Sequence, residues 1–132
     1  MGRFIAPPRL SLPLRAVFDI DANPNLDRLL ERHFNMLGYT LAKRSDLLWS
    51  FVRGAWAHQF WQKDIRRWAT RLNVAAYELD NGGCRITCFL DVDATFKQPG
   101  HKMIAHLADE LRDLRELLGG RDAPSKAGEG RA

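Results

Sequence analysis

Two strand-like runs joined by Asn81-Gly82 constrain the fold more than any other stretch of this sequence. An Asn-Gly pair between alternating hydrophobic runs is the strongest short-range signal of a β-hairpin. On the second arm, every second residue from Cys84 to Phe96 is apolar, which is the pattern of a half-buried strand. We therefore expect a long antiparallel hairpin between Arg66 and Phe96.

A two-residue turn at Asn81-Gly82 also predicts which residues of the two arms face each other. It places apolar residues opposite apolar residues on one face and opposite charges together on the other face. The predicted partners are Leu79 with Cys84, Tyr77 with Ile86, Ala75 with Cys88, and Glu78 with Arg85. Slipping the register by one residue would set Leu79 against Arg85 and Glu78 against Ile86, so the pattern and the turn chemistry agree on one alignment.

Patterns in the rest of the chain place this hairpin in an α+β fold. The sequence predicts a strand over 14–20, a helix over 26–37 capped at Asn23-Pro24, a second hairpin over 39–53, and a helix over 103–118. The order is strand, helix, four strands, helix, which predicts an antiparallel sheet of about five strands with both helices on one face. This element order resembles one half of the saddle fold of the TATA-box-binding protein. The resemblance lies in element order alone and implies no residue roles.

The predicted organisation is a single domain over 13–119, with an extended N-terminal arm over 1–12 and a disordered tail over 120–132. The arm holds Pro7 and Pro8 and little periodicity, and the tail consists mainly of Gly, Pro, Ser and charged residues. The apolar runs fall far short of the roughly 18 residues that span a bilayer, and the start lacks the apolar segment of a signal peptide. We therefore expect a cytoplasmic protein without a transmembrane segment.

The two cysteines, Cys84 and Cys88, are expected to be small core residues. Four residues apart on one strand face, they would lie about 13 Å apart, too far for a disulfide or a shared metal. Of the four histidines, His33 lies on the apolar face of the first helix, and His58 alone remains a site candidate. We expect neither a metal nor a cofactor.

Aromatic and basic residues are concentrated in one stretch of the chain. All four tryptophans, Trp49, Trp56, Trp61 and Trp68, fall within twenty residues, and between residues 43 and 71 seven basic residues oppose two acidic ones, a local excess of +5. The candidate anion-binding residues are Arg53, Lys63, Arg66, Arg67 and Arg71. Such a pattern occurs where bases of single-stranded nucleic acid stack, at lipid headgroups, or where tryptophans simply pack in a core with arginines around them.

The predicted hairpin register leaves an apolar patch on the second face of the sheet. Leu72, Val74 and Phe89 lie there, while both helices are needed on the first face. Because monomers seldom expose large apolar patches, we expect it to be covered by a second subunit, by an apolar ligand, or by the segment from Gly54 to Lys63. This segment holds Trp56, Phe60 and Trp61, and we call it the aromatic connection. A β-bulge that turns Leu72 and Val74 back into the core is the alternative.

Evidence for catalysis is weaker. Asp91 and Asp93 are neighbours on the second face, and with His58 they form an acid-base hypothesis, but no nucleophile or phosphate-binding motif accompanies them. On the last helix, Glu110 is expected on the solvent-exposed face among other charged residues of mixed sign. A non-enzymatic protein is therefore favoured.

Three hypotheses follow from the sequence. The first is a binding or self-association module, a homodimer, that uses an open sheet face and the aromatic connection; its residues are Trp56, Phe60, Trp61, Leu72, Val74 and Phe89. The second is binding of single-stranded nucleic acid or another anionic surface through the basic patch. The third is a small enzyme that uses Asp91, Asp93 and His58.

Overall fold

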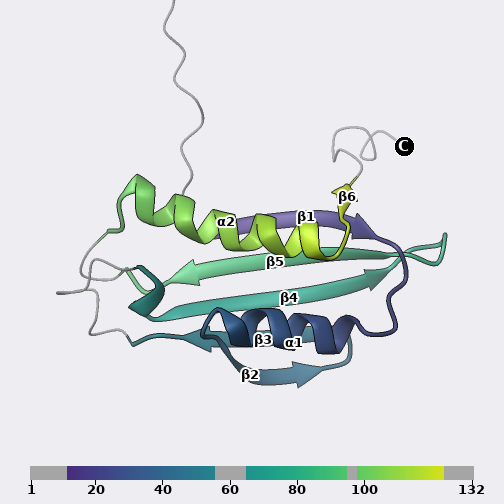
Figure 1. Ribbon diagram of the computed structural model, residues 1–132, viewed down its shortest axis with the longest axis horizontal. Helices are drawn as coiled ribbons and strands as arrows, with labels where there is room; N and C mark the ends of the chain where they lie inside the picture. Colours follow the sequence, from purple (N-terminus) through teal and green to yellow (C-terminus); the bar gives the residue numbers. More distant parts are fainter. Residues whose placement is uncertain (1–11, 56–64, 95–97, 124–132) are drawn as a thin grey trace, which may run out of the picture.

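One antiparallel sheet of six strands carries two helices in the computed structural model, which describes residues 12–55, 65–94 and 98–123 (Figure 1). The elements are β1 Leu14–Ile20, α1 Leu26–Met36, β2 Thr40–Ser45, β3 Leu48–Arg53, the 3₁₀ helix η2 Ile65–Arg67, β4 Thr70–Glu78, β5 Cys84–Val92, α2 His101–Leu117 and β6 Arg121–Asp122. The strand order across the sheet is β2-β3-β4-β5-β1-β6. The predicted α+β fold and its element order are confirmed. The short strand β6 is an addition, formed by residues that the sequence placed in the tail.

Both helices lie on one face of the sheet, with α1 over the β3 side and α2 along β1 and β5 (Figure 1). The core fills the space between helices and sheet because alternate residues of the strands point into it. Two tryptophans belong to this core: Trp49 is 2% exposed and Trp68 is fully buried. Packing is thus the role of these two, while Trp56 and Trp61 lie outside the described residues.

Each helix buries one stripe of apolar side chains. On α1 the stripe is Leu26, Leu30 and Phe34, spaced four residues apart, and full burial of a side chain such as Leu30 contributes about 1.5 to 3 kcal/mol. The helix begins after Asn25 rather than at Asn23, whose side chain accepts a hydrogen bond from the Asn25 backbone at 2.9 Å. No helix in the described parts of the chain is long and apolar enough to cross a membrane.

The central hairpin exists, but its predicted register is wrong by one residue. Glu78 lies opposite Cys84, Ala76 opposite Ile86, and Val74 opposite Cys88. The register differs because the loop has three residues, 80–82, and not two. The Gly82 backbone donates to the Leu79 carbonyl at 3.0 Å, and the Leu79 backbone then donates to the Gly83 carbonyl at 2.8 Å.

Gly82 makes this loop possible because its φ is +90°, in the left-handed region. A turn followed by a left-handed residue is the usual three-residue hairpin loop with a glycine bulge. The extra residue turns Leu72, Val74 and Ala76 toward the helices. Leu72 and Val74 are therefore in the core, as the bulge alternative expected, but the length of the loop places them there and the strand pairing itself has no register shift.

The loop geometry predicts that Gly82→Ala lowers the free energy of unfolding by about 1 to 2 kcal/mol, the penalty for a left-handed alanine. Sterics add nothing, since no atom lies within 4 Å of a Cβ placed at Gly82. Gly82→Asn should lose less, because asparagine tolerates this conformation better. Urea denaturation of the three proteins measures the difference. Equal stability of the Ala variant and the parent protein would contradict this loop conformation.

Candidate functional site

The sheet face opposite the helices, here called the open face, carries a group of mainly apolar side chains. Leu48, Ala75, Thr87 and Val17 are successive cross-strand neighbours on β3, β4, β5 and β1. Tyr77 and Phe89 lie two residues further along β4 and β5, on opposite sides of that row. We call these six residues the apolar band: Val17, Leu48, Ala75, Tyr77, Thr87 and Phe89.

Exposure makes the apolar band unusual. Tyr77 is 67% exposed, and Leu48 and Phe89 are each 43% exposed. These are three of the five large hydrophobic residues found to be exposed in the described parts of the chain. The other two, Met36 and Leu117, lie on the two separate helices.

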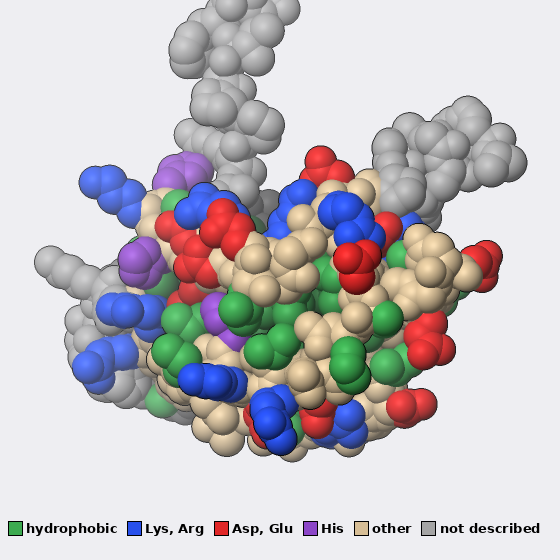
Figure 2. All heavy atoms as spheres, turned by 45° about the vertical axis from the view of Figure 1, so that its right-hand side comes forward, with side chains coloured by type: hydrophobic (Ala, Val, Ile, Leu, Met, Phe, Trp, Pro, Cys, Tyr) green, Lys and Arg blue, Asp and Glu red, His purple; other side chains and the backbone are tan. Residues whose placement is uncertain are grey.

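On the helix-bearing side, a strip of hydrophobic side chains runs between charged groups above and below (Figure 2).

Charged residues of opposite sign border the apolar band at both ends. At one end Asp19 of β1 and Arg85 of β5 form an ion pair, with Nε 2.8 Å from Oδ1 and Nη2 3.2 Å from Oδ2. The hydrogen bond from Arg85 holds the pKa of Asp19 below its usual value, so this carboxylate stays ionised at neutral pH. At the other end, Arg71 is the cross-strand neighbour of Asp91. Arg15 of β1 also lies directly opposite Phe89, so the band is bordered by charges of both signs with an excess of basic groups.

The patch predicted from the sequence is wrong in composition. Leu72 and Val74 are both fully buried under the helices, because the three-residue loop shifts β4 by one position. Phe89 does lie on the open face. Leu48, Tyr77 and Val17 were missed, although alternation with the core residues of their own strands could have identified them. Trp56, Phe60 and Trp61 lie outside the described residues.

The candidate anion-binding residues do not share one surface. Arg53 is only 7% exposed and its side chain points into the core, whereas Arg71 lies on the open face. Arg66 and Arg67 are exposed on η2. Lys63 lies outside the described residues. The assignment of Arg53 to an anion-binding surface is therefore wrong, because β3 directs alternate residues toward the helices.

Asp91 and Asp93 lie together, as predicted, in a hollow of about 420 Å³ at one end of β3, β4 and β5. The hollow also includes Thr70 and Arg71. Asp91 accepts a hydrogen bond from the Val92 backbone at 2.9 Å. His58, the third member of the acid-base hypothesis, lies outside the described residues, so that hypothesis stays a prediction.

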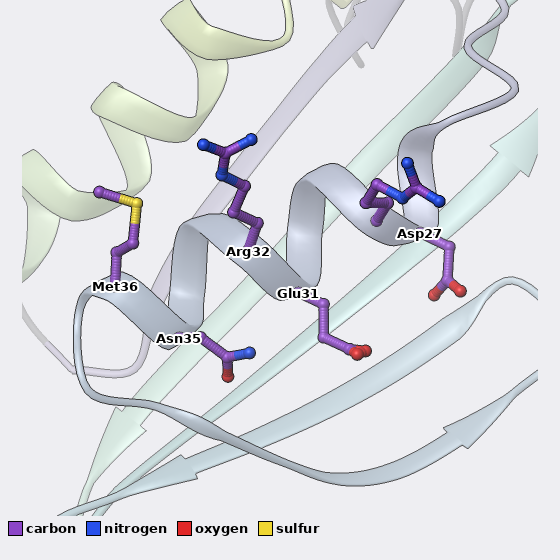
Figure 3. Close-up of a pocket in the computed structure, with 6 residues that line it drawn as sticks. Asp27, Glu31, Arg32, Asn35 and Met36 are labelled. Atoms are coloured by element: carbon purple, nitrogen blue, oxygen red, sulfur yellow. The ribbon is translucent and has the colours of Figure 1, made fainter.

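A second hollow, of about 610 Å³, lies on the outer surface of α1 (Figure 3). Its labelled residues all come from this one helix. Figure 3 shows Arg32 and Met36 pointing away from Asn35 and Asp27, so the side chains do not converge on a common point. Because convergent polar groups are what orient a ligand, we do not take this hollow as a site.

The polar interior is the feature that the sequence analysis missed. Arg53 of β3 donates through Nη1 to Oε2 of Glu110 on α2 and to the carbonyl of Leu37 after α1, both at 2.9 Å. Tyr39 donates its hydroxyl to Oε1 of Glu110 at 3.0 Å, and the Arg53 guanidinium lies 4.1 Å from the centre of the Tyr39 ring. These three side chains form what we call the buried polar cluster.

Glu110 was expected in solvent but is only 6% exposed. Its spacing of three residues from Leu107 and four from Leu114 puts it on the buried stripe of α2, which is the signal that could have revealed it. Burial and the neighbouring Glu110 carboxylate raise the pKa of Tyr39, so its hydroxyl remains a proton donor. Within the described residues, Nε and Nη2 of Arg53 are buried without a hydrogen-bond partner. The three side chains of the cluster are thus joined by hydrogen bonds, but not every buried N–H group of Arg53 has an acceptor among the described residues.

The predicted core role of the cysteines holds for one of them. Cys88 is fully buried, and burial raises the pKa of its thiol to about 12, so it is unreactive at neutral pH. Cys84 is only half-buried.

His33 lies beside the buried polar cluster, facing α2. Burial lowers the pKa of His33, and the Glu110 backbone and the carboxylates of Asp113 and Glu110 oppose this effect. Its Nε2 atom is buried and has no hydrogen-bond partner within the described part of the chain. The folded protein therefore favours the neutral imidazole.

The buried ion pair predicts strong coupling between Arg53 and Glu110. Arg53→Met or Glu110→Leu alone should lower the free energy of unfolding by about 3 to 5 kcal/mol, because each leaves a buried charge unpaired. The double variant should lose less than the sum of the singles, by about 1 to 3 kcal/mol. The same cycle on the exposed pair Arg112–Asp109 is the control and should give a coupling below about 1 kcal/mol. Additive losses at Arg53 and Glu110 would contradict the cluster.

The environment of His33 predicts a loss of stability in mild acid. The pKa of the His33 imidazole is about 6.5 in the unfolded chain and lower in the folded protein. Between these two pKa values the unfolded chain binds a proton that the folded chain does not, so the free energy of unfolding decreases as the pH falls. The decrease levels off below the folded-state pKa. His33→Gln should flatten this dependence between about pH 7.5 and 5.5, whereas His106→Gln, at an exposed position on α2, should not. Urea denaturation across that range tests the prediction, and identical pH profiles for His33→Gln and the parent would contradict it.

Comparison of the chain with protein-family models, with curated proteins and with solved structures finds no match.

Proposed function

We propose that this protein is a small binding and self-association module whose open face packs against the open face of a second copy. The observation that carries the proposal is the apolar band, in which Leu48, Tyr77 and Phe89 are exposed on the same sheet face, on β3, β4 and β5. Monomeric proteins seldom expose contiguous apolar surface of this kind, and its burial is the main favourable term in association.

The charges around the band support a second copy as the partner. Both ends of the band have neighbours of both signs: Asp19 and Arg85 at one end, and Asp91 with Arg71 and Arg15 at the other. A twofold axis brings the same surface of both copies together, so carboxylates of one copy can lie opposite basic groups of the other. A polyanion, in contrast, would meet carboxylates at both ends of the band.

Aromatic anchors are also the residues that most often dominate association energies. Tyr77 and Phe89 have that character, and the rigid sheet beneath them holds them in place at little entropic cost. The proposal therefore assigns the energetic centre of the interface to Tyr77 and Phe89 and leaves Leu72 and Val74 to the core.

Sedimentation velocity should find a dimer at tens of micromolar, and Tyr77→Glu should give a monomer with nearly unchanged stability, because this side chain is 67% exposed. Phe89→Glu is the second variant. Met36→Glu, at a residue 79% exposed on α1, is the matched control and should leave the dimer intact. A parent protein that is monomeric at these concentrations, or a Tyr77→Glu protein that still dimerises, would overturn the proposal.

The alternative is binding of single-stranded nucleic acid or another polyanion, for which Arg66 and Arg67 are the exposed candidates. Titration of a labelled oligonucleotide at low and high salt distinguishes the two. Tight binding that weakens steeply with salt would favour the alternative, since neutralised phosphates release counterions.

A further inference from the structure

Among the residues that the structure describes, strand β1 is a sheet edge along half of its length. It pairs with β5 over all of Leu14–Ile20, but on its other side it pairs with β6 only at Phe18 and Asp19. Within the described residues, positions 14–17 therefore have no strand on that side. Unpaired backbone N–H and C=O groups of this kind form a template for another strand.

The free half of β1 is less protected than the opposite edge, since its one exposed charged residue is Arg15. There, β2 has a register shift between Leu41 and Lys43 and exposes the charged residues Lys43 and Arg44, features that hinder strand addition. The register of β1 with β5 runs without a shift from Leu14 to Ile20. Of the two edges, β1 is the one suited to accept a strand.

A hollow of about 320 Å³ lies beside this free edge, between β1 and α2, which run next to each other (Figure 1). Its floor is apolar, and its rim is basic. The apolar lining residues are Leu14, Ala16, Val17, Phe18, Ala108 and Leu111, and the basic ones are Arg15, Arg112 and Arg115. Strand-adding peptides gain affinity from main-chain hydrogen bonds and specificity from pockets that take alternate side chains.

The charge of the rim indicates what the hollow accepts, because three arginines and no carboxylate line it. Arg112 and Arg115 are paired with Asp109 and Asp122, at 2.7 and 2.5 Å, but both pairs are solvent-exposed. Exposed pairs contribute at most about 1 kcal/mol, so an incoming carboxylate can replace them.

Two other occupants fit less well. A second copy adding its own β1 would bring the same arginines together, and like charges repel across an interface. The sequence that follows β6 would, in the antiparallel register of Phe18 with Asp122, set Pro124 opposite Ala16. Proline has no N–H to donate, and Lys126 two residues later has the wrong charge for this rim.

We propose that the free half of β1 and the hollow beside α2 bind an extended acidic segment of another protein as an added strand. An apolar side chain of that segment enters the hollow, and its carboxylates meet Arg112 and Arg115. This surface meets the apolar band at Val17, but it uses the edge of the sheet, whereas the aromatic residues of the band lie on β4 and β5.

Fluorescence anisotropy with a labelled peptide of alternating glutamate and valine tests the proposal. The parent protein should bind this peptide, and the variant Arg112→Glu with Arg115→Glu should bind it at least about tenfold more weakly, because two attractive charges become repulsive. Arg28→Glu with Arg32→Glu, at exposed positions on the outer face of α1, is the matched control and should bind normally.

Two further peptides separate strand addition from simple charge attraction. Replacement of every glutamate by lysine should abolish binding, and N-methylation of every peptide amide should weaken it by at least about tenfold because the main-chain hydrogen bonds are lost. Hydrogen exchange should show new protection of backbone amides within 14–17 when the acidic peptide is present. No binding of the acidic peptide, or equal binding of its N-methylated form, would overturn the proposal. Tyr77→Glu should leave peptide binding unchanged, so failure here and failure of self-association are distinguishable.

Discussion

A single buried guanidinium ties together the elements that cover this sheet. Arg53 extends from β3 into the core and bonds both the carbonyl that follows α1 and the carboxylate of Glu110 on α2. A cation at the C-terminal end of a helix is favoured by the helix dipole, and here a carboxylate neutralises it as well. Burial of either charge alone is strongly unfavourable, so the two helices must be placed correctly for either residue to be tolerated.

The buried polar cluster lies within a two-layer arrangement of helices on a sheet. The two helices and the sheet share one continuous apolar core, and the polar cluster sits between them where α1 ends. Because α1 and α2 both pack on the same face, the opposite face has no described element over it. The apolar band is the direct result, since strands that alternate side chains must present something on both faces.

The two proposed surfaces follow from different incomplete features of one sheet. The apolar band is a face without a second layer, and the free half of β1 is an edge without a full neighbouring strand. In the proposals, a second copy binds the apolar band by burying aromatic side chains, and an acidic peptide binds the edge through main-chain hydrogen bonds and charge. The two surfaces adjoin at Val17, so the proposals place a second copy on the face of the sheet and a peptide at the edge next to it.

The sequence by itself determined the elements, because hydrophobic periodicity and turn residues are local signals. The alternation in Leu14–Ile20, the helical spacing from Leu26 to Phe34 and the Asn81-Gly82 turn all correspond to observed elements. Only the tertiary structure decided the register and the faces. A hairpin loop of two or of three residues suits the same Asn-Gly pair, and that one residue moves Leu72 and Val74 from an open face into the core. In the same way, charge alone predicts that Arg53 and Glu110 lie in solvent. They are buried because they form an ion pair with each other, and they are 57 residues apart in the sequence. No local pattern contains such a contact.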